Sequence, residues 1–168
     1  MNYQTPPSIC EYMISLMPEW AFTILEPTPG EGNIVRQLLL KDVSVTAPDD
    51  FFTMNFKQRF DCIVMNPPFS HKTANLQNSP KDIDLKGLQV GYYILKQCMA
   101  MSDHVIAIMP ITIITDSDKR KEELALFGLK SVTILPRKTF DYNRIASVVL
   151  ELHKGYVGLR ELKMSNFK

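Results

Sequence analysis

Short apolar runs alternate with amphipathic segments along most of the chain. The apolar runs are rich in β-branched and aromatic residues, which is typical of buried strands. They predict strands at residues 21–26, 43–46, 60–65, 104–110, 129–136 and 145–154. The segments between them place apolar residues at helical spacing. They predict one helix that Thr5 caps and Pro18 ends, and others at residues 34–41, 87–101 and 116–128.

The order of these elements predicts an α/β fold. Strands that alternate with helices are typical of a mostly parallel sheet. The last two strands are joined by residues 137–144, which carry no helical pattern, so we expect an antiparallel C-terminal strand. In open sheets of this class, ligands bind beyond the carboxyl ends of the strands. The polar segment 70–86 has no periodicity and predicts a long loop, a kind of segment that is often functional.

Composition limits the classes of protein that fit. The chain has 168 residues, of which 45% are hydrophobic and 22% charged, as expected for one soluble globular domain. The formal net charge of +1 gives no strong indication for or against a nucleic-acid partner. The three cysteines are widely spaced and form no Cys-x-x-Cys pair, so neither a disulfide framework nor a metal site is expected.

The chain carries no pattern that targets it to a membrane. No apolar run approaches the ~20 residues of a membrane span, and no signal-peptide pattern begins the sequence. We therefore expect a cytoplasmic protein without a membrane partner. The tail after His153 is basic and predicts a solvated extension.

The segment "EPTPGEG" follows the first predicted strand and precedes a helix. Its glycines, Gly30 and Gly32, allow a ligand to approach the backbone closely. The segment lacks the Gly-Lys-Ser/Thr of a Walker loop and the third glycine of a dinucleotide fingerprint. By itself it is equally compatible with a tight turn that only serves packing. Glu26, at the strand end, either accepts hydrogen bonds from a ligand or is an ordinary exposed carboxylate.

The segment "NPPF", at residues 66–69, follows the third predicted strand. Pro67 and Pro68 fix the backbone and have no N–H groups, so their carbonyl groups are available as acceptors. The side-chain oxygen of Asn66 and the carbonyl of Pro67 would form a pair of acceptors for one amino group. Phe69 would stack on the ring that carries this amine. The alternative is a strand-ending turn that Asn66 caps, but all four residue types fit one chemical task.

Three segments together resemble a known pattern. They are, in chain order, "NYQTPPSICEYM", "EPTPGEG" and "NPPF". Their pattern resembles that of the S-adenosylmethionine-dependent DNA adenine-N6 methyltransferases, and "LPRKTFDYNRIASVVLELHK" is similar to the C-terminal part of the same family. The resemblance extends from Tyr3 to about Lys154 and implies a Rossmann-like methyltransferase fold. It also implies direct methyl transfer from S-adenosylmethionine to the exocyclic N6 amine of adenine in DNA, with no metal.

The resemblance implies a cofactor site in two parts. The residues implied to bind or close over the methionine part are Tyr3, Thr5, Pro6, Glu26, Pro27, Gly30 and Gly32. Asp50 and Phe51 resemble the family's pair for the cofactor's adenine, with the carboxylate on its amino group and the ring against its face. In the family, a further acid binds the cofactor ribose at the end of the preceding strand, where this chain has Ala47-Pro48. Asp49 is the expected substitute.

The resemblance implies a separate site for the target base. Asn66 and Pro67 would hold the target amine, and Phe69 would stack on a base flipped out of the duplex. Phe140 is either a second wall of this site or a core aromatic residue. In the 70–86 loop, His71 and Lys72, together with Lys81, are the candidates for contact with nucleic acid.

The chain is contracted relative to this family between the cofactor loop and "NPPF". Residues 33–59 have room for one helix, one clear strand and a loop, so one strand–helix unit is expected to be missing. The sequence also leaves no room for a separate target-recognition domain. Specificity for a DNA sequence is therefore expected to be low or to come from a protein partner.

Other classes of function remain compatible with the sequence. "NPPF" also resembles RNA guanine-N2 and protein glutamine methyltransferases, although the N-terminal "QTPP" favours DNA. The contraction is compatible with an inactive protein that keeps the fold and binds nucleic acid or a protein. Binding of S-adenosylmethionine would separate this last class from the enzymes.

Overall fold

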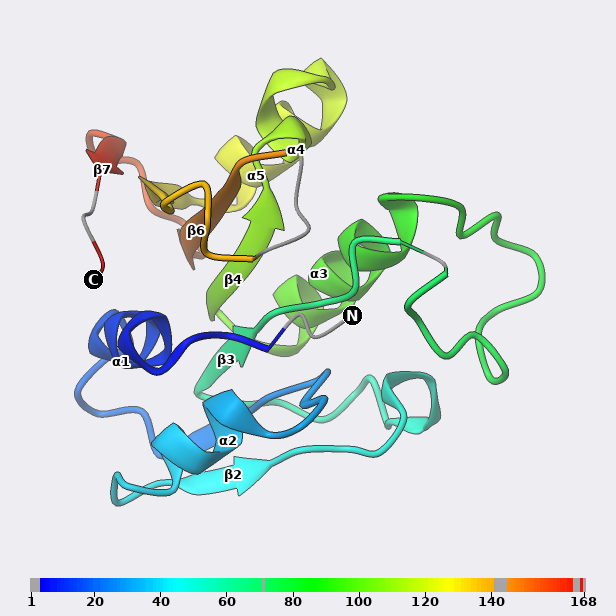
Figure 1. Cartoon of the computed structure of the whole chain (residues 1–168), viewed down its shortest axis with the longest axis horizontal. Helices are drawn as coiled ribbons and strands as arrows, with labels where there is room; N and C mark the ends of the chain where they lie inside the picture. The colour runs from blue at the N-terminus through cyan, green and yellow to red at the C-terminus, as the bar shows by residue number, and fades with distance from the viewer. Residues whose placement is uncertain (1–3, 71, 141–144, 165–166, 168) are drawn as a thin grey trace.

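The chain folds around one sheet that has helices on both faces (Figure 1). The computed structural model describes residues 4–70, 72–140, 145–164 and 167. Within these residues the sheet has seven strands in the order β2-β1-β3-β4-β6-β5-β7. The strands are β1 (Thr23–Leu25), β2 (Ser44–Thr46), β3 (Cys62–Met65), β4 (His104–Pro110), β5 (Leu129–Ile134), β6 (Ser147–His153) and β7 (Glu161–Met164).

The helices form two layers, one on each face of the sheet. They are α1 (Pro7–Ser15), α2 (Asn33–Leu38), α3 (Gln89–Met101), α4 (Thr112–Thr115) and α5 (Asp118–Phe127), with a 3-10 turn η1 (Phe51–Thr53). The buried residues of α1 and α2 pack on one face, and those of α3 and α5 on the other.

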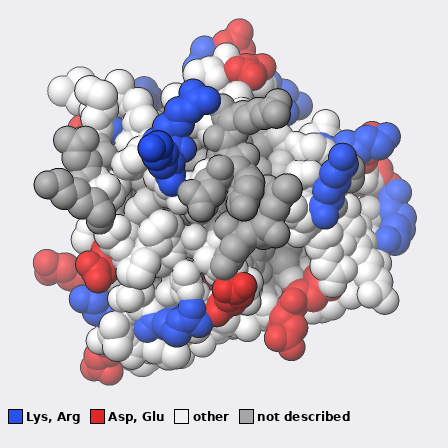
Figure 2. Space-filling model, viewed as in Figure 1, with Lys and Arg blue, Asp and Glu red and all other residues white. Residues whose placement is uncertain are grey.

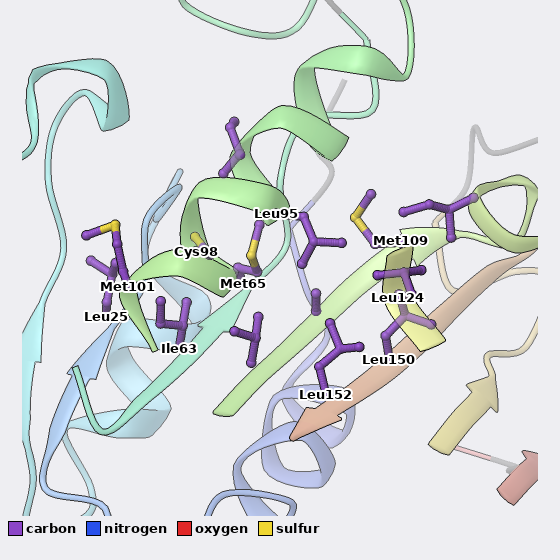
Figure 3. Close-up of a cluster of buried hydrophobic side chains, with 14 of the residues drawn as sticks. Leu25, Ile63, Met65, Leu95, Cys98, Met101, Met109, Leu124, Leu150 and Leu152 are labelled. Atoms are coloured by element: carbon purple, nitrogen blue, oxygen red, sulfur yellow. The ribbon is translucent and has the colours of Figure 1, made fainter. Parts of the chain in front are cut away.

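The central strand β3 is buried on both faces. All of its residues are buried, which explains why its sequence is apolar without alternation. Cys62 and Val64 join the core cluster of α1 and α2, whereas Ile63 and Met65 join that of α3 and α5, because successive side chains of a strand point to opposite faces. Figure 3 shows this second cluster between α3 and the sheet.

The order of the strands brings two loops together. β1 lies between β2 and β3 and runs parallel to both. After β2 at the edge, the chain crosses back past β1 to form β3, so the loops that follow β1 and β3 leave the same end of neighbouring strands. Such a point is the usual ligand site of open α/β sheets. It brings "EPTPGEG" beside "NPPF".

The predicted fold class is confirmed, including the antiparallel strand near the C-terminus. β6 runs antiparallel to its neighbours β4 and β5, and the other described strand pairs are parallel. Each predicted strand and helix corresponds to an observed element; β4 has the predicted bounds, α2 is shorter but begins one residue earlier, and the others are somewhat shorter. The described residues between 33 and 59 form α2, β2 and η1.

The first helix begins differently from the prediction. α1 starts at Pro7, and Pro6 is its N-cap residue without a side-chain capping hydrogen bond. Thr5 therefore does not cap the helix. Its hydroxyl oxygen instead accepts a hydrogen bond from the side chain of Asn66. Proline is tolerated at the first helical position because its missing N–H would have no helical partner there.

The sequence did not predict α4 or β7. α4 is a short helix after β4, and β7 is an edge strand that pairs in parallel with β5. The prediction that the tail is only a solvated extension is therefore wrong, since part of it extends the sheet. β7 has 4 residues that are largely exposed, so it lacks the apolar run that marks a buried strand.

Charged side chains of both signs are interspersed over the face of the molecule in Figure 2. This agrees with the nearly balanced formal charge of +1. Among the described residues, the longest apolar helices are too short to cross a membrane.

Candidate functional site

A cavity of about 880 Å³ opens beyond the carboxyl ends of β1 and β3. Its volume lies within the range of small-molecule sites, about 300–1,000 Å³. The sequence-predicted site residues that line it are Pro27, Gly30, Asp49, Asp50, Phe51, Asn66, Pro67, Pro68, Phe69 and Phe140. The fold therefore brings the predicted cofactor residues and the "NPPF" residues to one cavity, although they are far apart in the sequence.

The other predicted site residues that the structure describes do not line this cavity. Thr5 and Glu26 line a smaller adjoining pocket of about 30 Å³, which shares Asn66 with the large cavity. Three predicted site residues in the described part of the chain, Pro6, Gly32 and Lys72, line neither pocket. Two predicted residues, Tyr3 and His71, lie outside the described part of the chain.

Asn66 is held by two other segments of the chain. Its side-chain Nδ2 donates to Thr5 Oγ1 at 3.2 Å, and its backbone carbonyl accepts from Thr28 Oγ1 at 3.3 Å. Thr5 precedes α1, and Thr28 belongs to "EPTPGEG". The three segments that carried the sequence resemblance therefore meet at Asn66.

Gly91 of α3 lies directly against "NPPF". A Cβ atom at this position would lie 2.8 Å from the carbonyl oxygen of Pro68 and 3.7 Å from Cγ of Pro67. The first distance is too short for any side chain, and the contacted atom is rigid backbone. A residue without a Cβ atom is therefore needed for α3 to pack at its observed distance from the motif.

We predict that Gly91→Ala destabilises the protein by about 1–3 kcal/mol through overpacking. The direction of the change in stability tests the contact, because a Gly→Ala change inside an unobstructed helix stabilises a protein by up to about 1 kcal/mol. Unfolding in urea measures the change. Gln89→Ala, at an exposed position of the same helix, serves as the control and should change stability by less than about 0.5 kcal/mol. A Gly91→Ala variant more stable than the wild type would contradict the contact.

Glu26 is buried at the end of β1, with 1% of its surface exposed. The alternative of an ordinary exposed carboxylate is therefore wrong. Its Oε1 accepts hydrogen bonds from the backbone N–H of Thr28 at 2.9 Å and from Thr28 Oγ1 at 3.3 Å. Burial raises the pKa of Glu26 to about 8, and the hydrogen bonds from Thr28 oppose this shift only in part.

The raised pKa of Glu26 predicts a loss of stability as the pH rises. Between the unfolded pKa of 4.5 and the folded pKa of about 8, the folded state keeps a proton that the unfolded chain releases. The free energy of unfolding should therefore fall by up to about 1.4 kcal/mol per pH unit in this window. Glu26→Gln keeps the acceptor for Thr28 and removes the titration. Denaturant unfolding from pH 5 to 8 should show a flatter profile for this variant, and parallel profiles would refute the assignment.

The glycine-rich loop combines two left-handed residues. Gly30 has φ of +53° and Gly32 has φ of +82°, a region that residues with a side chain rarely adopt. Gly32 is the N-cap residue of α2, whereas Gly30 is exposed at the cavity. The side chain of Gln4 lies against Gly30, because a Cβ atom at Gly30 would lie 2.7 Å from Gln4 Nε2.

Asp50 lies after β2 and caps the turn η1. Its Oδ1 accepts from the backbone N–H of Phe52 at 2.9 Å, and its Oδ2 accepts from Asn78 Nδ2 at 2.8 Å. Asn78 belongs to the 70–86 loop, so this loop contacts the predicted adenine-binding carboxylate. The neighbouring Asp49 is exposed.

The aromatic residues of the cavity differ in burial. Phe51 is only 4% exposed and belongs to the core cluster of α3, so little of its ring is available to a ligand. Phe52 beside it is half-buried and also lines the cavity. Phe140 is 5% exposed in the opposite cluster and lines the cavity as well, so it is a core residue and a cavity wall. Phe69 is half-buried and packs against the same cluster.

Sequence reasoning missed several residues of the site. Gln4 lies inside "NYQTPPSICEYM" and Thr28 inside "EPTPGEG". Their positions within these motifs could therefore have indicated that they belong to the site. Asn78 has no such signal, because only the folded loop brings it to Asp50. Lys81, a candidate for contact with nucleic acid, donates to the carbonyls of Leu76 and Gln77 within its own loop. The described residues contain no group of three or more His, Cys, Asp or Glu that could hold a metal ion.

The fold is that of the S-adenosylmethionine-dependent methyltransferases. A protein from Listeria monocytogenes assigned to class I of these enzymes superposes with a TM-score of 0.65 and 17% identity, over 97% of this chain and 65% of the other. A modification subunit assigned to a type I restriction enzyme of Vibrio vulnificus superposes with a TM-score of 0.69 and 19% identity, over 97% of this chain and 47% of the other.

A methyltransferase subunit of a type I restriction-modification system from Streptococcus thermophilus gives a similar result. Its TM-score is 0.65 at 14% identity, over 92% of this chain and 45% of the other. The chain thus spans about half to two thirds of the length of these proteins. No protein-family model and no curated protein sequence matches the chain. At such low identities, the likeness is one of fold.

Proposed function

We propose that the chain transfers a methyl group from S-adenosylmethionine to the N6 amine of adenine in DNA. The observation that supports this most is that Asn66, Pro67 and Phe69 share one cavity with Gly30 and Asp50, at the switch point of a methyltransferase fold. The cavity is large enough for a cofactor beside a base. Two structural neighbours are assigned to type I restriction or restriction-modification systems, and a further one, DrdV, was solved in complex with DNA; these neighbours support DNA as the substrate class rather than RNA or protein.

The cofactor half of the site consists of residues that follow β1 and β2, together with the segment that precedes α1. Gly30 and Pro27 would border the methionine moiety of the cofactor, and Glu26 and Thr5 would lie behind them. The other residues proposed to bind this moiety are Gly32, Pro6 and Tyr3. The fit is supported by the acceptor chemistry of Asp50, whose Oδ2 already receives an amide NH₂ group, that of Asn78. The amino group of adenine is a donor of the same kind and would replace Asn78. Asp49, exposed beside it, would accept from the ribose hydroxyls.

The target half of the site consists of "NPPF" and Phe140. Asn66 Oδ1 and the Pro67 carbonyl would accept the two hydrogens of the target amine, and Pro68 would fix their spacing. Phe69 would stack on the base, with Phe140 as the second wall. Lys72 and His71, which follow "NPPF" closely in the sequence, would contact the nucleic-acid backbone.

The chemistry that these residues perform is positioning and charge stabilisation. The bound cofactor would supply an electrophilic methyl group. Asn66 and Pro67 would orient the lone pair of the amine toward it, and orientation alone contributes a large part of such rate enhancements. Their oxygens would also stabilise the positive charge that develops on the nitrogen as the bond forms. The extra proton of the product amine would then leave to solvent.

A protein partner is the proposed source of sequence specificity. The structural neighbours from restriction systems are subunits, and this chain matches about half of each.

Two experiments test the proposed function. Isothermal titration calorimetry should detect S-adenosylmethionine binding, and Asp50→Ala should weaken it by about tenfold or more, as expected for a lost hydrogen bond to a charged group. Tritium from the methyl-labelled cofactor should then enter unmethylated DNA but not RNA or release-factor protein. If no binding were detected at millimolar S-adenosylmethionine, every methyltransferase function would be rejected. If tritium entered only RNA or only protein, the assignment of DNA as the substrate would be rejected, but methyl transfer would not.

A further inference from the structure

β7 forms one edge of the described sheet, at the opposite end from β2 (Figure 1). It pairs in parallel with β5, and among the described residues no strand adjoins its other side. The guanidinium of Arg160, just before β7, donates to the backbone carbonyl of Ala125 in α5 at 3.3 Å. After β7, the ring of Phe167 lies 5.2 Å from that of Tyr12 in α1. β7 is therefore anchored at both ends and presents a backbone edge that can pair with another strand.

The apolar side chains of β7 are not covered by the fold. Leu162 pairs in register with Val132 of β5, which belongs to the core cluster of α3 and α5. Met164, two residues later, points to the same face of the sheet. Leu162 is 69% exposed and Met164 is 83% exposed. Contiguous exposed apolar surface of this kind is typical of protein–protein interaction sites.

The charged side chains of β7 lie on the opposite face of the sheet. Lys163 pairs in register with Thr133, whose hydroxyl lies 2.6 Å from that of Tyr12 in α1. Glu161, two residues earlier, points to the same face as Lys163. The nearest charged atoms of Glu161 and Lys163 are 3.8 Å apart. Such an exposed pair adds little to stability within one chain, and both charges can also contact a second strand.

Antiparallel pairing of β7 with β7 of a second copy has one favourable register. With Leu162 opposite Leu162 of the second copy, Glu161 lies opposite Lys163 of the second copy, and Lys163 opposite Glu161. Sliding one strand by two residues is the smallest shift that keeps every side chain on its own face. That shift places either Glu161 opposite Glu161 or Lys163 opposite Lys163. Opposite charges stabilise a strand pair and like charges destabilise it, so β7 is complementary to itself in the first register and not in the two next to it.

We propose that β7 is the dimerisation edge of this chain and pairs with β7 of a second copy about a twofold axis at Leu162. The two sheets then form one continuous sheet across the dimer. Both copies contribute the same surface, as a twofold dimer requires, and β7 is no longer a free edge. Leu162 meets its counterpart on one face, and two ion pairs form on the other. The proposal does not depend on the proposed function, because the residues of β7 do not line the cavity.

Analytical ultracentrifugation tests whether the dimer forms. At concentrations up to about 1 mM, which include weak complexes, the wild type should reach a mass of twice 19.2 kDa. Lys163→Glu should raise the Kd of the dimer by about tenfold or more, because two opposite-charge pairs become two like-charge pairs. The exchanged variant Glu161→Lys/Lys163→Glu should return the Kd to that of the wild type. A wild type that stays at 19.2 kDa would overturn the proposal.

Lys57→Glu is the matched control for the change in charge. Lys57 is exposed and lies between η1 and β3, away from β7. Its variant should keep the wild-type Kd of the dimer. Equal losses in Lys57→Glu and Lys163→Glu would mean that net charge, and not the register of β7, controls association, and the proposal would be wrong. It would also be wrong if the exchanged variant associated no better than Lys163→Glu.

Cross-linking tests the position of the twofold axis. Directly opposite residues of antiparallel strands have Cα atoms about 4.5–5.5 Å apart, which a disulfide can span. Leu162→Cys should therefore give a covalent dimer on mild oxidation with diamide. The two copies of Met164→Cys would lie about 14 Å apart along the strands, too far for a disulfide. The chain's own thiols, those of Cys10, Cys62 and Cys98, are buried. Equal yields from the two variants, or no covalent dimer from Leu162→Cys, would overturn the proposal.

Discussion

Replacing Asn66 with Ala is expected to slow methyl transfer by about 10²–10³-fold, the loss typical of removing one preorganised hydrogen-bonding group from a reacting centre. The change removes the acceptor that would hold the target amine and stabilise its developing charge. The cofactor half of the cavity, with Gly30 and Asp50, is left intact. Single-turnover transfer of labelled methyl groups measures the rate, and calorimetry measures the Kd for the cofactor.

Asn55→Ala is the matched control for this prediction. Asn55 is exposed and does not line the cavity, and the hydrogen bond described for its side chain is a local one from the backbone N–H of Lys57. Its variant should keep the wild-type rate. If Asn66→Ala transferred methyl groups as fast as this control, "NPPF" would not hold the reacting amine. If Asn66→Ala weakened cofactor binding without slowing methyl transfer, Asn66 would belong to the cofactor site and not to the site of the target amine.

Replacing Leu95 with Ala is expected to lower the free energy of unfolding by about 2–5 kcal/mol, the range for large-to-small changes in a packed core. Leu95 lies in the middle of α3, is fully buried and belongs to the cluster between this helix and the sheet (Figure 3). Denaturant unfolding measures the loss.

Leu126→Ala makes the same chemical change at a position that is 78% exposed on α5. It should change stability by less than about 0.5 kcal/mol, since little apolar surface is lost from the core. Equal effects at Leu95 and Leu126 would mean that α3 is not packed on the sheet as described.

The sequence predicts the centre of this fold better than its edges. The strand at 60–65 is apolar throughout because β3 is buried on both faces, so its pattern is unambiguous. β7 has no such pattern, because it lies at the edge of the sheet and most of its residues are exposed. The start of α1 was misassigned because Thr5 has the chemistry of a capping residue, and only the tertiary structure gives its hydroxyl another partner, Asn66.

The candidate site was predictable where the residues themselves have unusual chemistry. Two prolines after a buried strand and two glycines before a helix stand out in the sequence, and the topology brings them together. Contacts that depend on the folding of a long loop do not stand out, which is why Asn78 was missed. The burial of Glu26 was also open from sequence, since a carboxylate at a strand end is compatible with either environment.

The most direct test of the proposed function is mass spectrometry of DNA incubated with the protein and trideuteromethyl-labelled S-adenosylmethionine. After digestion to nucleosides, the account predicts trideuterated N6-methyldeoxyadenosine with the wild-type chain and at least about 100-fold less with Asn66→Ala. Label on another nucleoside, or equal amounts of labelled deoxyadenosine from both proteins, would contradict it.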